Sequence, residues 1–177
     1  MGILQFFHDV FGMTLGPKDQ DPMNLSDIAR SQIGTQEDAA HTNKGAAILK
    51  YQEATNLDGQ GWPWCAAFVD WCVEQFLEEA PNPALKRPQT ASAYGLLDWG
   101  RANGCRVFTG NDKILQAQPG DIVVYTFSHC GIVSKAPDGG FFRAIEGNTN
   151  PDGGRDGYEV AERLRALSLV MSFIRLP

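Results

Sequence analysis

Cys65 is the residue whose type and position most strongly indicate covalent chemistry. It follows a loop rich in glycine, tryptophan and proline, and it begins an apolar segment with helical periodicity. The first turn of a helix offers unpaired backbone N–H groups and the positive end of the helix dipole, and both favour a thiolate over a neutral thiol. The neighbouring N–H groups can also hold an oxyanion. The position of Cys65 therefore predicts nucleophilic attack on a carbonyl carbon.

His129 is the candidate base for that nucleophile. Of the three histidines, His8 belongs to a terminal segment and His41 to a predicted loop. His129 comes about sixty residues after Cys65 and directly precedes a short apolar run that is typical of a β-strand. A strand is a rigid support from which an imidazole can face a thiolate. A cysteine with a histidine base is the pair that nucleophilic acyl transfer requires.

Glu146 and Asn148 are the candidates for the polar group that orients His129. Glu146 ends the next apolar run, and Asn148 follows two positions later. Adjacent strands of a hairpin can place either side chain beside the imidazole, where a hydrogen bond fixes its tautomer. The residues alone leave open which of the two does so.

Three residues just ahead of Cys65 are candidates for substrate contact. Trp62 and Trp64 flank the nucleophile, so either ring can line a cleft or belong to the core. Gln60 carries an amide that can donate a hydrogen bond to an oxyanion, although its loop can equally serve as a simple turn.

The elements that must position these residues fall into two groups. Helical periodicity and capping residues predict helices that start within residues 24–27 and end at residue 33, and at 45–55, 65–79 and 91–102. Short apolar runs between turns predict strands at 120–125, 129–134, 140–145 and 167–176. Helices followed by antiparallel strands predict an α+β fold, one domain over residues 24–177. Residues 1–23 form an apolar extension, expected to dock as a short helix or to meet a partner.

Composition excludes several classes of partner. The chain of 177 residues has a net charge of -6 and no run of lysine or arginine, so no nucleic-acid partner is expected. No apolar run reaches the roughly 20 residues that a membrane span requires, so stable membrane insertion is not expected either. The first residues lack the features of a signal peptide, which predicts synthesis in the cytoplasm.

The remaining cysteines carry no clear signal for chemistry. Four cysteines without a C-x-x-C pair predict neither a disulfide scaffold nor a structural zinc site. Cys72, Cys105 and Cys130 are expected to be small buried side chains. A Cys72–Cys105 or Cys105–Cys130 bridge formed after export stays open.

Four ordered blocks of sequence resemble the CHAP family, the cysteine- and histidine-dependent amidohydrolases/peptidases. The blocks are WCAAFV at 64–69, GDIVV at 120–124, HCGIV at 129–133 and EGNTN at 146–150. The resemblance extends over about residues 24–177. It implies a papain-like fold of the CHAP/NlpC-P60 type and a peptidoglycan substrate, cleaved at the muramoyl–L-alanine amide or at a peptide bond of the stem or crossbridge.

The resemblance also implies a role for each matched residue. Cys65 corresponds to the nucleophile, His129 to the base, Glu146 to the orienting group and Asn148 to a further polar member. The chain departs from the pattern in two places. Cys130 replaces the aliphatic residue that commonly follows the histidine, and the acidic calcium loop of some relatives is reduced to N-x-D-x-Q at 56–60. No metal or other cofactor is therefore expected.

Two biological settings and two other functions stay open. The chain can be a phage-type lysin released through a membrane lesion, or an antibacterial effector carried by a secretion machinery and opposed by an immunity protein. In both settings it acts in the periplasm or cell wall. The same residues can also support transamidation or deamidation of a host protein. A non-catalytic binding module is the remaining alternative, and the intact set of site residues argues against it.

Overall fold

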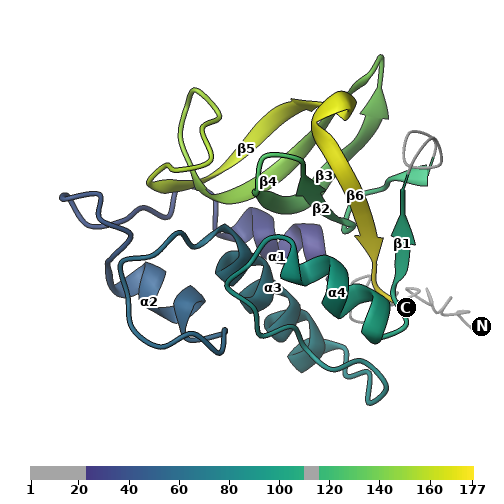
Figure 1. Ribbon diagram of the computed structural model, residues 1–177, viewed down its shortest axis with the longest axis horizontal. Coiled ribbons are helices and arrows are strands. Elements are labelled where there is room, and N and C mark those ends of the chain that lie inside the picture. Colours follow the sequence, from purple (N-terminus) through teal and green to yellow (C-terminus); the bar gives the residue numbers. More distant parts are fainter. Residues whose placement is uncertain (1–22, 110–115) are drawn as a thin grey trace, which may run out of the picture.

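A computed structural model of the chain describes residues 23–109 and 116–177 and has helices on one side of a β-sheet (Figure 1). The apolar extension expected for residues 1–23 lies, apart from Met23, outside the described residues. The helices are α1 (Leu25–Ser31), α2 (Ala46–Gln52), α3 (Cys65–Glu79), α4 (Gly95–Ala102) and the short 3-10 helix η2 (Leu167–Leu169). The strands are β1 (Arg106–Phe108), β2 (Ile122–Tyr125), β3 (Cys130–Asp138), β4 (Phe141–Thr149), β5 (Glu159–Ala166) and β6 (Val170–Arg175).

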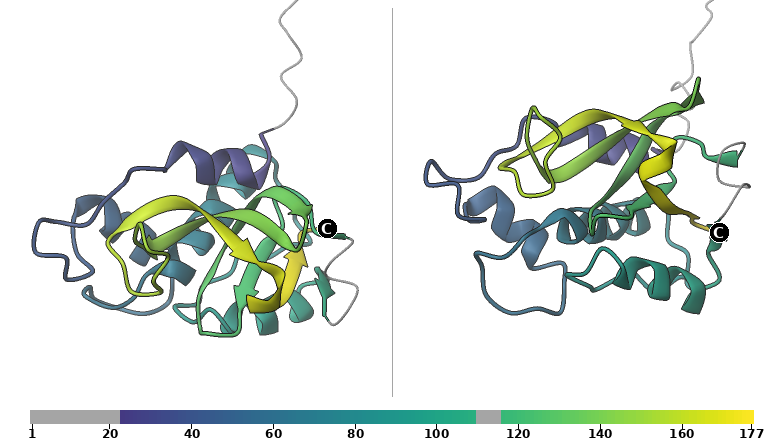
Figure 2. Two further views of the ribbon diagram at one scale, coloured as in Figure 1. Left: turned by 90° about the horizontal axis from the view of Figure 1, so that it is seen from above. Right: turned by 45° about the horizontal axis from the view of Figure 1, so that its top comes forward.

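The six strands form one antiparallel sheet in the order β1-β6-β2-β3-β4-β5. The last strand of the chain, β6, yellow in Figure 1, therefore lies between β1 and β2. In the right-hand view of Figure 2 most of the helical layer lies beneath the sheet. This arrangement confirms the predicted α+β fold, with N-terminal helices packed on a C-terminal antiparallel sheet.

The sequence reading missed two strands and misplaced several ends. Strand β1 is only three residues long, and the edge strand β5 mixes charged and apolar side chains, so neither contains a recognisable apolar run. Residues 91–94 form turns instead of the first turn of a helix, and residues 167–169 form η2 instead of strand. Strand β4 continues to Thr149, so Glu146 and Asn148 both lie within it.

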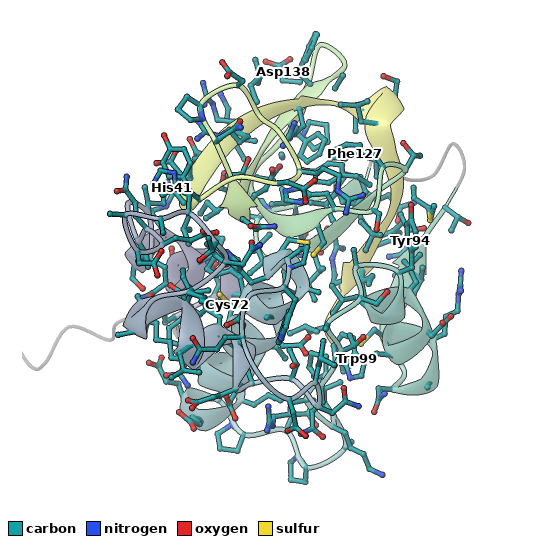
Figure 3. The ribbon with its side chains drawn as sticks, turned by 60° about the vertical axis from the view of Figure 1, so that its left-hand side comes forward. His41, Cys72, Tyr94, Trp99, Phe127 and Asp138 are labelled. Atoms are coloured by element: carbon teal, nitrogen blue, oxygen red, sulfur yellow. The ribbon has the colours of Figure 1, made fainter. Side chains whose placement is uncertain are left out.

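Apolar side chains are buried on both faces of the sheet. In β2, Ile122 and Val124 pack in the cluster that contains the helices, whereas Val123 and Tyr125 belong to a second cluster. This alternation is that expected of a strand buried on both faces. Figure 3 places Cys72 of α3 within the helical layer and Phe127 with the sheet. The central helix α3 packs against both β3 and β4, which brings its first residue close to those strands.

Two residues of the sequence blocks have structural roles. Asp121 accepts two hydrogen bonds from Arg175 of β6, at 2.7 and 2.8 Å, and so ties the start of β2 to the last strand. Gly147 of β4 lies directly against α3. A Cβ atom at this position would come within 2.6 Å of Phe68 Cβ and 2.7 Å of Trp64 Cζ3. Only glycine therefore lets β4 approach the helix this closely.

We expect Gly147→Ala to lower the free energy of unfolding in urea by about 1–3 kcal/mol, the usual range for overpacking a core. It should also shift the NMR resonance of the Trp64 indole N–H, which donates to Glu37 Oε1 at 2.8 Å. Gly34→Ala is the control, since nothing lies within 4 Å of its Cβ position and its left-handed φ of 88° reports backbone strain alone. An unshifted Trp64 resonance in Gly147→Ala would contradict the predicted contact.

Candidate active site

Cys65 is the first residue of α3, as the sequence predicted. The residue before it, Trp64, makes no side-chain capping hydrogen bond to the helix. The first backbone N–H groups of α3 are therefore available to a negative charge. The backbone N–H of Ala66 interacts with the Cys65 thiol and favours its ionised form by lowering its pKa. Cys65 is 5% exposed, so the sulfur is sheltered from bulk water yet reachable from a pocket.

His129 precedes β3 and lies between Cys65 and Glu146. It is fully buried, and its Nε2 atom lies 3.0 Å from Glu146 Oε2. Glu146, and not Asn148, is thus the group that orients the imidazole. Nδ1 is the nitrogen left to face the thiol. Among the described residues no well-formed hydrogen bond reaches Nδ1, although Cys65 is close enough to raise the pKa of His129. Such loose contacts are common before substrate binds.

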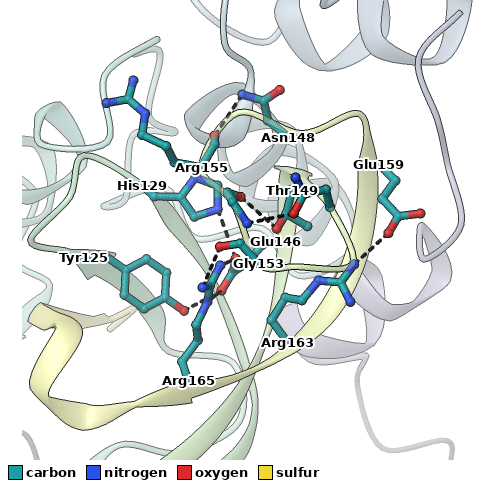
Figure 4. A network of polar contacts seen from close by, with 12 residues as sticks. Tyr125, His129, Glu146, Asn148, Thr149, Gly153, Arg155, Glu159, Arg163 and Arg165 are labelled. Atoms are coloured by element: carbon teal, nitrogen blue, oxygen red, sulfur yellow. Dashed lines mark hydrogen bonds and ion pairs between the residues drawn. The ribbon is translucent and has the colours of Figure 1, made fainter. Parts of the chain in front are cut away.

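Glu146 is a buried carboxylate held by three partners (Figure 4). Arg165 donates from Nε to Oε1 at 2.8 Å and from Nη2 to Oε2 at 2.5 Å. Tyr125 donates its hydroxyl to Oε1 at 2.7 Å. Burial alone would raise the pKa of Glu146, but Arg165 and His129 outweigh it and lower that pKa. Glu146 therefore stays ionised and can stabilise an imidazolium.

Gly131 makes room for Glu146. A Cβ atom at Gly131 would come within 2.7 Å of both Glu146 Cγ and the backbone oxygen of Ile145. The glycine two positions after His129 is thus required for the close packing of β3 and β4 at the orienting carboxylate.

The pKa directions of the pair favour a thiolate with an imidazolium. The pKa of Cys65 lies well below its usual value because of a hydrogen bond with Cys130, which acts against burial and is reinforced by His129. Burial alone would lower the pKa of His129, but the contacts with Cys65 and Glu146 raise it to about 9. Both directions favour a proton on the imidazole over a proton on the thiol.

Cys130 is more than the small core residue that we expected. It is fully buried, and burial together with the neighbouring Cys65 raises its pKa well above the usual value. Its neutral thiol can therefore donate to the Cys65 thiolate. All four cysteines are free thiols, so neither of the bridges left open by the sequence is present.

A pocket of about 290 Å³ opens beside Cys65. Its lining comes from four segments and consists of Leu57, Trp62, Pro63, Cys65, Ala91, Ser92, Ala93, Ser128 and Arg155. Trp62 is half-buried and lies where the substrate contact expected of it can occur.

Two of the expected substrate contacts are not placed at this pocket. Trp64 is fully buried, where its ring stacks on Tyr51 at 5.7 Å between centroids, so it belongs to the core. Gln60 lines a different pocket with Glu53 and Asp58. No group of three or more His, Cys, Asp or Glu side chains that could hold a metal occurs within the described parts of the chain.

Asn148 shapes the loop that follows β4. Its φ of 56° is left-handed, and the pairing of β4 with β5 shifts register between Glu146 and Thr149. Its side-chain Nδ2 donates to the backbone oxygen of Arg155 at 3.3 Å, and its own carbonyl accepts from Gly157 N at 2.9 Å. Asn148 thus organises residues 150–157, the turn-rich segment beside the pocket.

Arg165 and Tyr125 are the functional candidates that the sequence reading missed. Arg165 lies in the overlooked strand β5, in which charged and apolar residues are mixed. Tyr125 ends an apolar strand and was counted only as core. The one available signal was the position of Glu146 at the end of an apolar run, since a carboxylate buried there requires a partner of opposite charge.

The chain is similar to known proteins in both sequence and fold. The model of the CHAP domain family matches residues 57–148, a segment that contains Cys65, His129, Glu146 and Asn148. A solved structure, the crystal structure of a wild-type endolysin LysIME-EF1, matches with a TM-score of 0.53 and 17% sequence identity. The match covers 87% of this chain and 64% of the endolysin chain, so the present chain spans less than two thirds of that protein. A search of the curated proteins found no match.

We expect iodoacetamide to alkylate Cys65 rapidly at neutral pH, because its lowered pKa leaves it ionised. Cys130→Val should move the inflection of the alkylation rate to higher pH. Cys130→Ser keeps a hydrogen-bond donor, so its inflection should lie closer to that of the wild type. Mass spectrometry separates Cys65 from Cys105, whose pKa burial raises to about 11. An inflection near the ordinary cysteine value in the wild type would contradict the predicted ion pair.

We expect Arg165→Met to raise the pKa of Glu146, measured by NMR, because the cation that offsets the burial of this carboxylate is lost. A Glu146 that takes up a proton no longer stabilises the imidazolium of His129. Alkylation of Cys65 at neutral pH should slow as a consequence. Arg163→Met is the matched control, since Arg163 lies in the same strand but pairs with Glu159 at 2.6 Å. Circular dichroism checks that both variants fold. Equal pKa values of Glu146 in the two variants would show that Arg165 does not hold this carboxylate ionised.

Proposed function

The chain belongs to the CHAP domain family, and from this membership we propose that it is a peptidoglycan hydrolase that cleaves an amide or peptide bond with Cys65 as nucleophile. The observation that carries the proposal is the contact of His129 with both Cys65 and the buried carboxylate of Glu146, at the start of a helix and beside a pocket. These groups are the ones that acyl transfer to a cysteine requires.

The reaction begins from the thiolate–imidazolium pair. The Cys65 thiolate attacks the amide carbonyl carbon, and the N–H groups at the start of α3 stabilise the oxyanion that forms. His129 then donates its proton to the departing amine. Glu146 balances the charge of the imidazolium until that proton leaves. A water molecule, from which His129 removes a proton, releases the acyl group from the sulfur.

The bond that is cut is the muramoyl–L-alanine amide or a peptide bond of the stem or crossbridge. Both are amides, and the trio of Cys65, His129 and Glu146 treats them alike, so the choice between them depends on the pocket. The lining by Trp62, several neutral side chains and Arg155 suits an extended peptide or sugar–peptide junction.

We place the reaction in the periplasm or cell wall, where peptidoglycan lies. The protein acts there either as a phage-type lysin or as an antibacterial effector delivered by a secretion machinery. An effector requires an immunity protein in the producing cell, and such a partner would cover the pocket beside Cys65. Within residues 23–109 and 116–177 no helix is long and apolar enough to cross a membrane.

We expect the wild type to release soluble fragments from purified sacculi and Cys65→Ala to release none, with the masses of the fragments identifying the bond. Cys105→Ala is the matched control, because Cys105 is a cysteine outside the pocket.

The rate at which sacculi are digested should fall as the pH rises through about 9, because His129 then loses the proton that the leaving amine requires.

Intact sacculi of both Gram-negative and Gram-positive origin after wild-type treatment would contradict the proposal. Transamidation or deamidation of a protein side chain would then become the leading function of the same residues, and transfer of a labelled amine to protein would identify it.

A further inference from the structure

One charged side chain stands among the described residues that line the pocket beside Cys65. It belongs to Arg155, and apart from the nucleophile Cys65 the other lining side chains are neutral. The chain as a whole carries a net charge of -6. A guanidinium in the pocket of an acidic protein gives that pocket a group that can bind an anion.

The loop that carries Arg155 is fixed to the end of β4 by hydrogen bonds on both sides of this residue. They run from Asn148 Nδ2 to Arg155 O (3.3 Å), from Gly154 N to Asn150 Oδ1 (2.8 Å), from Thr149 Oγ1 to Gly154 O (3.2 Å), from Arg165 Nη1 to Gly153 O (2.8 Å) and from Gly157 N to Asn148 O (2.9 Å). The side chain of Arg155 thus extends from a positioned backbone, which lowers the cost of using it to bind a ligand.

The guanidinium of Arg155 is not committed to the buried network. Figure 4 shows it directed away from Glu146, whereas the guanidinium of Arg165 points into that carboxylate. Its ion-pair partner is Asp156, at 3.3 Å, and the two side chains are 48% and 65% exposed. An exposed pair of this kind contributes little free energy, so a ligand carboxylate can replace Asp156.

We propose that Arg155 forms a carboxylate-binding subsite beside Cys65, and that the preferred substrate is a peptidoglycan stem peptide with a free carboxylate near the cleaved bond. The inference rests on the proposed function and specifies its substrate. A planar guanidinium binds a carboxylate through two parallel hydrogen bonds, which an amide in the same position cannot match. Stem peptides carry such a group where the α-carboxyl of the γ-linked D-glutamyl residue is free, and lack it where that group is amidated.

The test compares two synthetic stem-peptide fragments that differ only in a free or amidated D-glutamyl α-carboxyl group. Binding to the inactive Cys65→Ala protein is measured by calorimetry. The free acid should bind about tenfold or more tightly than the amide, the usual range for a charge-assisted contact. Adding Arg155→Gln should abolish this preference, and Arg155→Lys should retain part of it.

Arg101→Gln is the matched control. Arg101 pairs with a neighbouring aspartate, Asp98, at 3.5 Å and is 57% exposed, but it lies outside the pocket. It should leave the preference unchanged. Equal affinity of the two fragments, no binding of either, or a preference that survives Arg155→Gln would overturn the subsite. Failure to digest sacculi is a separate result, because the binding experiment uses a protein that cannot hydrolyse them.

Discussion

The buried carboxylate of Glu146 is the constraint on which the rest of the structure depends. A carboxylate without exposure is costly unless it is paired and hydrogen-bonded. Its partners are Tyr125, His129 and Arg165, at or beside β2, β3 and β5, while Glu146 itself lies in β4. These are four consecutive strands of the sheet. The strand order that positions the His129 imidazole therefore also brings together the partners that stabilise the buried charge of Glu146. The fold and the site depend on the same strand order.

Charge alternates along the line of contacts that runs from this carboxylate to the nucleophile. The cation Arg165 fixes the anion Glu146, which favours the imidazolium of His129, and the imidazolium in turn favours the thiolate of Cys65. Each group stabilises the ionised form of the next one, although burial alone would favour the neutral form. Cys130 adds a neutral donor at the end of this line, where water cannot easily reach the buried sulfur.

Local sequence could predict the parts of the site that depend on local structure. The position of Cys65 followed from a helix start, and that of His129 from the edge of an apolar strand. Arg165 could not be found in this way, because its partner is distant in sequence and its own strand mixes charged and apolar residues without a regular pattern. The burial of Trp64 was equally hidden, since a tryptophan beside a nucleophile suits both cleft and core, and only its packing on Tyr51 decides between them.

The tripeptide Glu146-Gly147-Asn148 has three separate physical requirements at successive positions. The first residue must be an anion, because His129 and Arg165 converge on it. The second must lack a side chain, because β4 lies against Phe68 of α3. The third must tolerate a left-handed backbone, with its φ of 56°, and turn the chain into the loop that presents Arg155, a conformation that asparagine adopts more readily than most residues. The motif therefore joins the chemistry of the buried base to the wall of the substrate pocket.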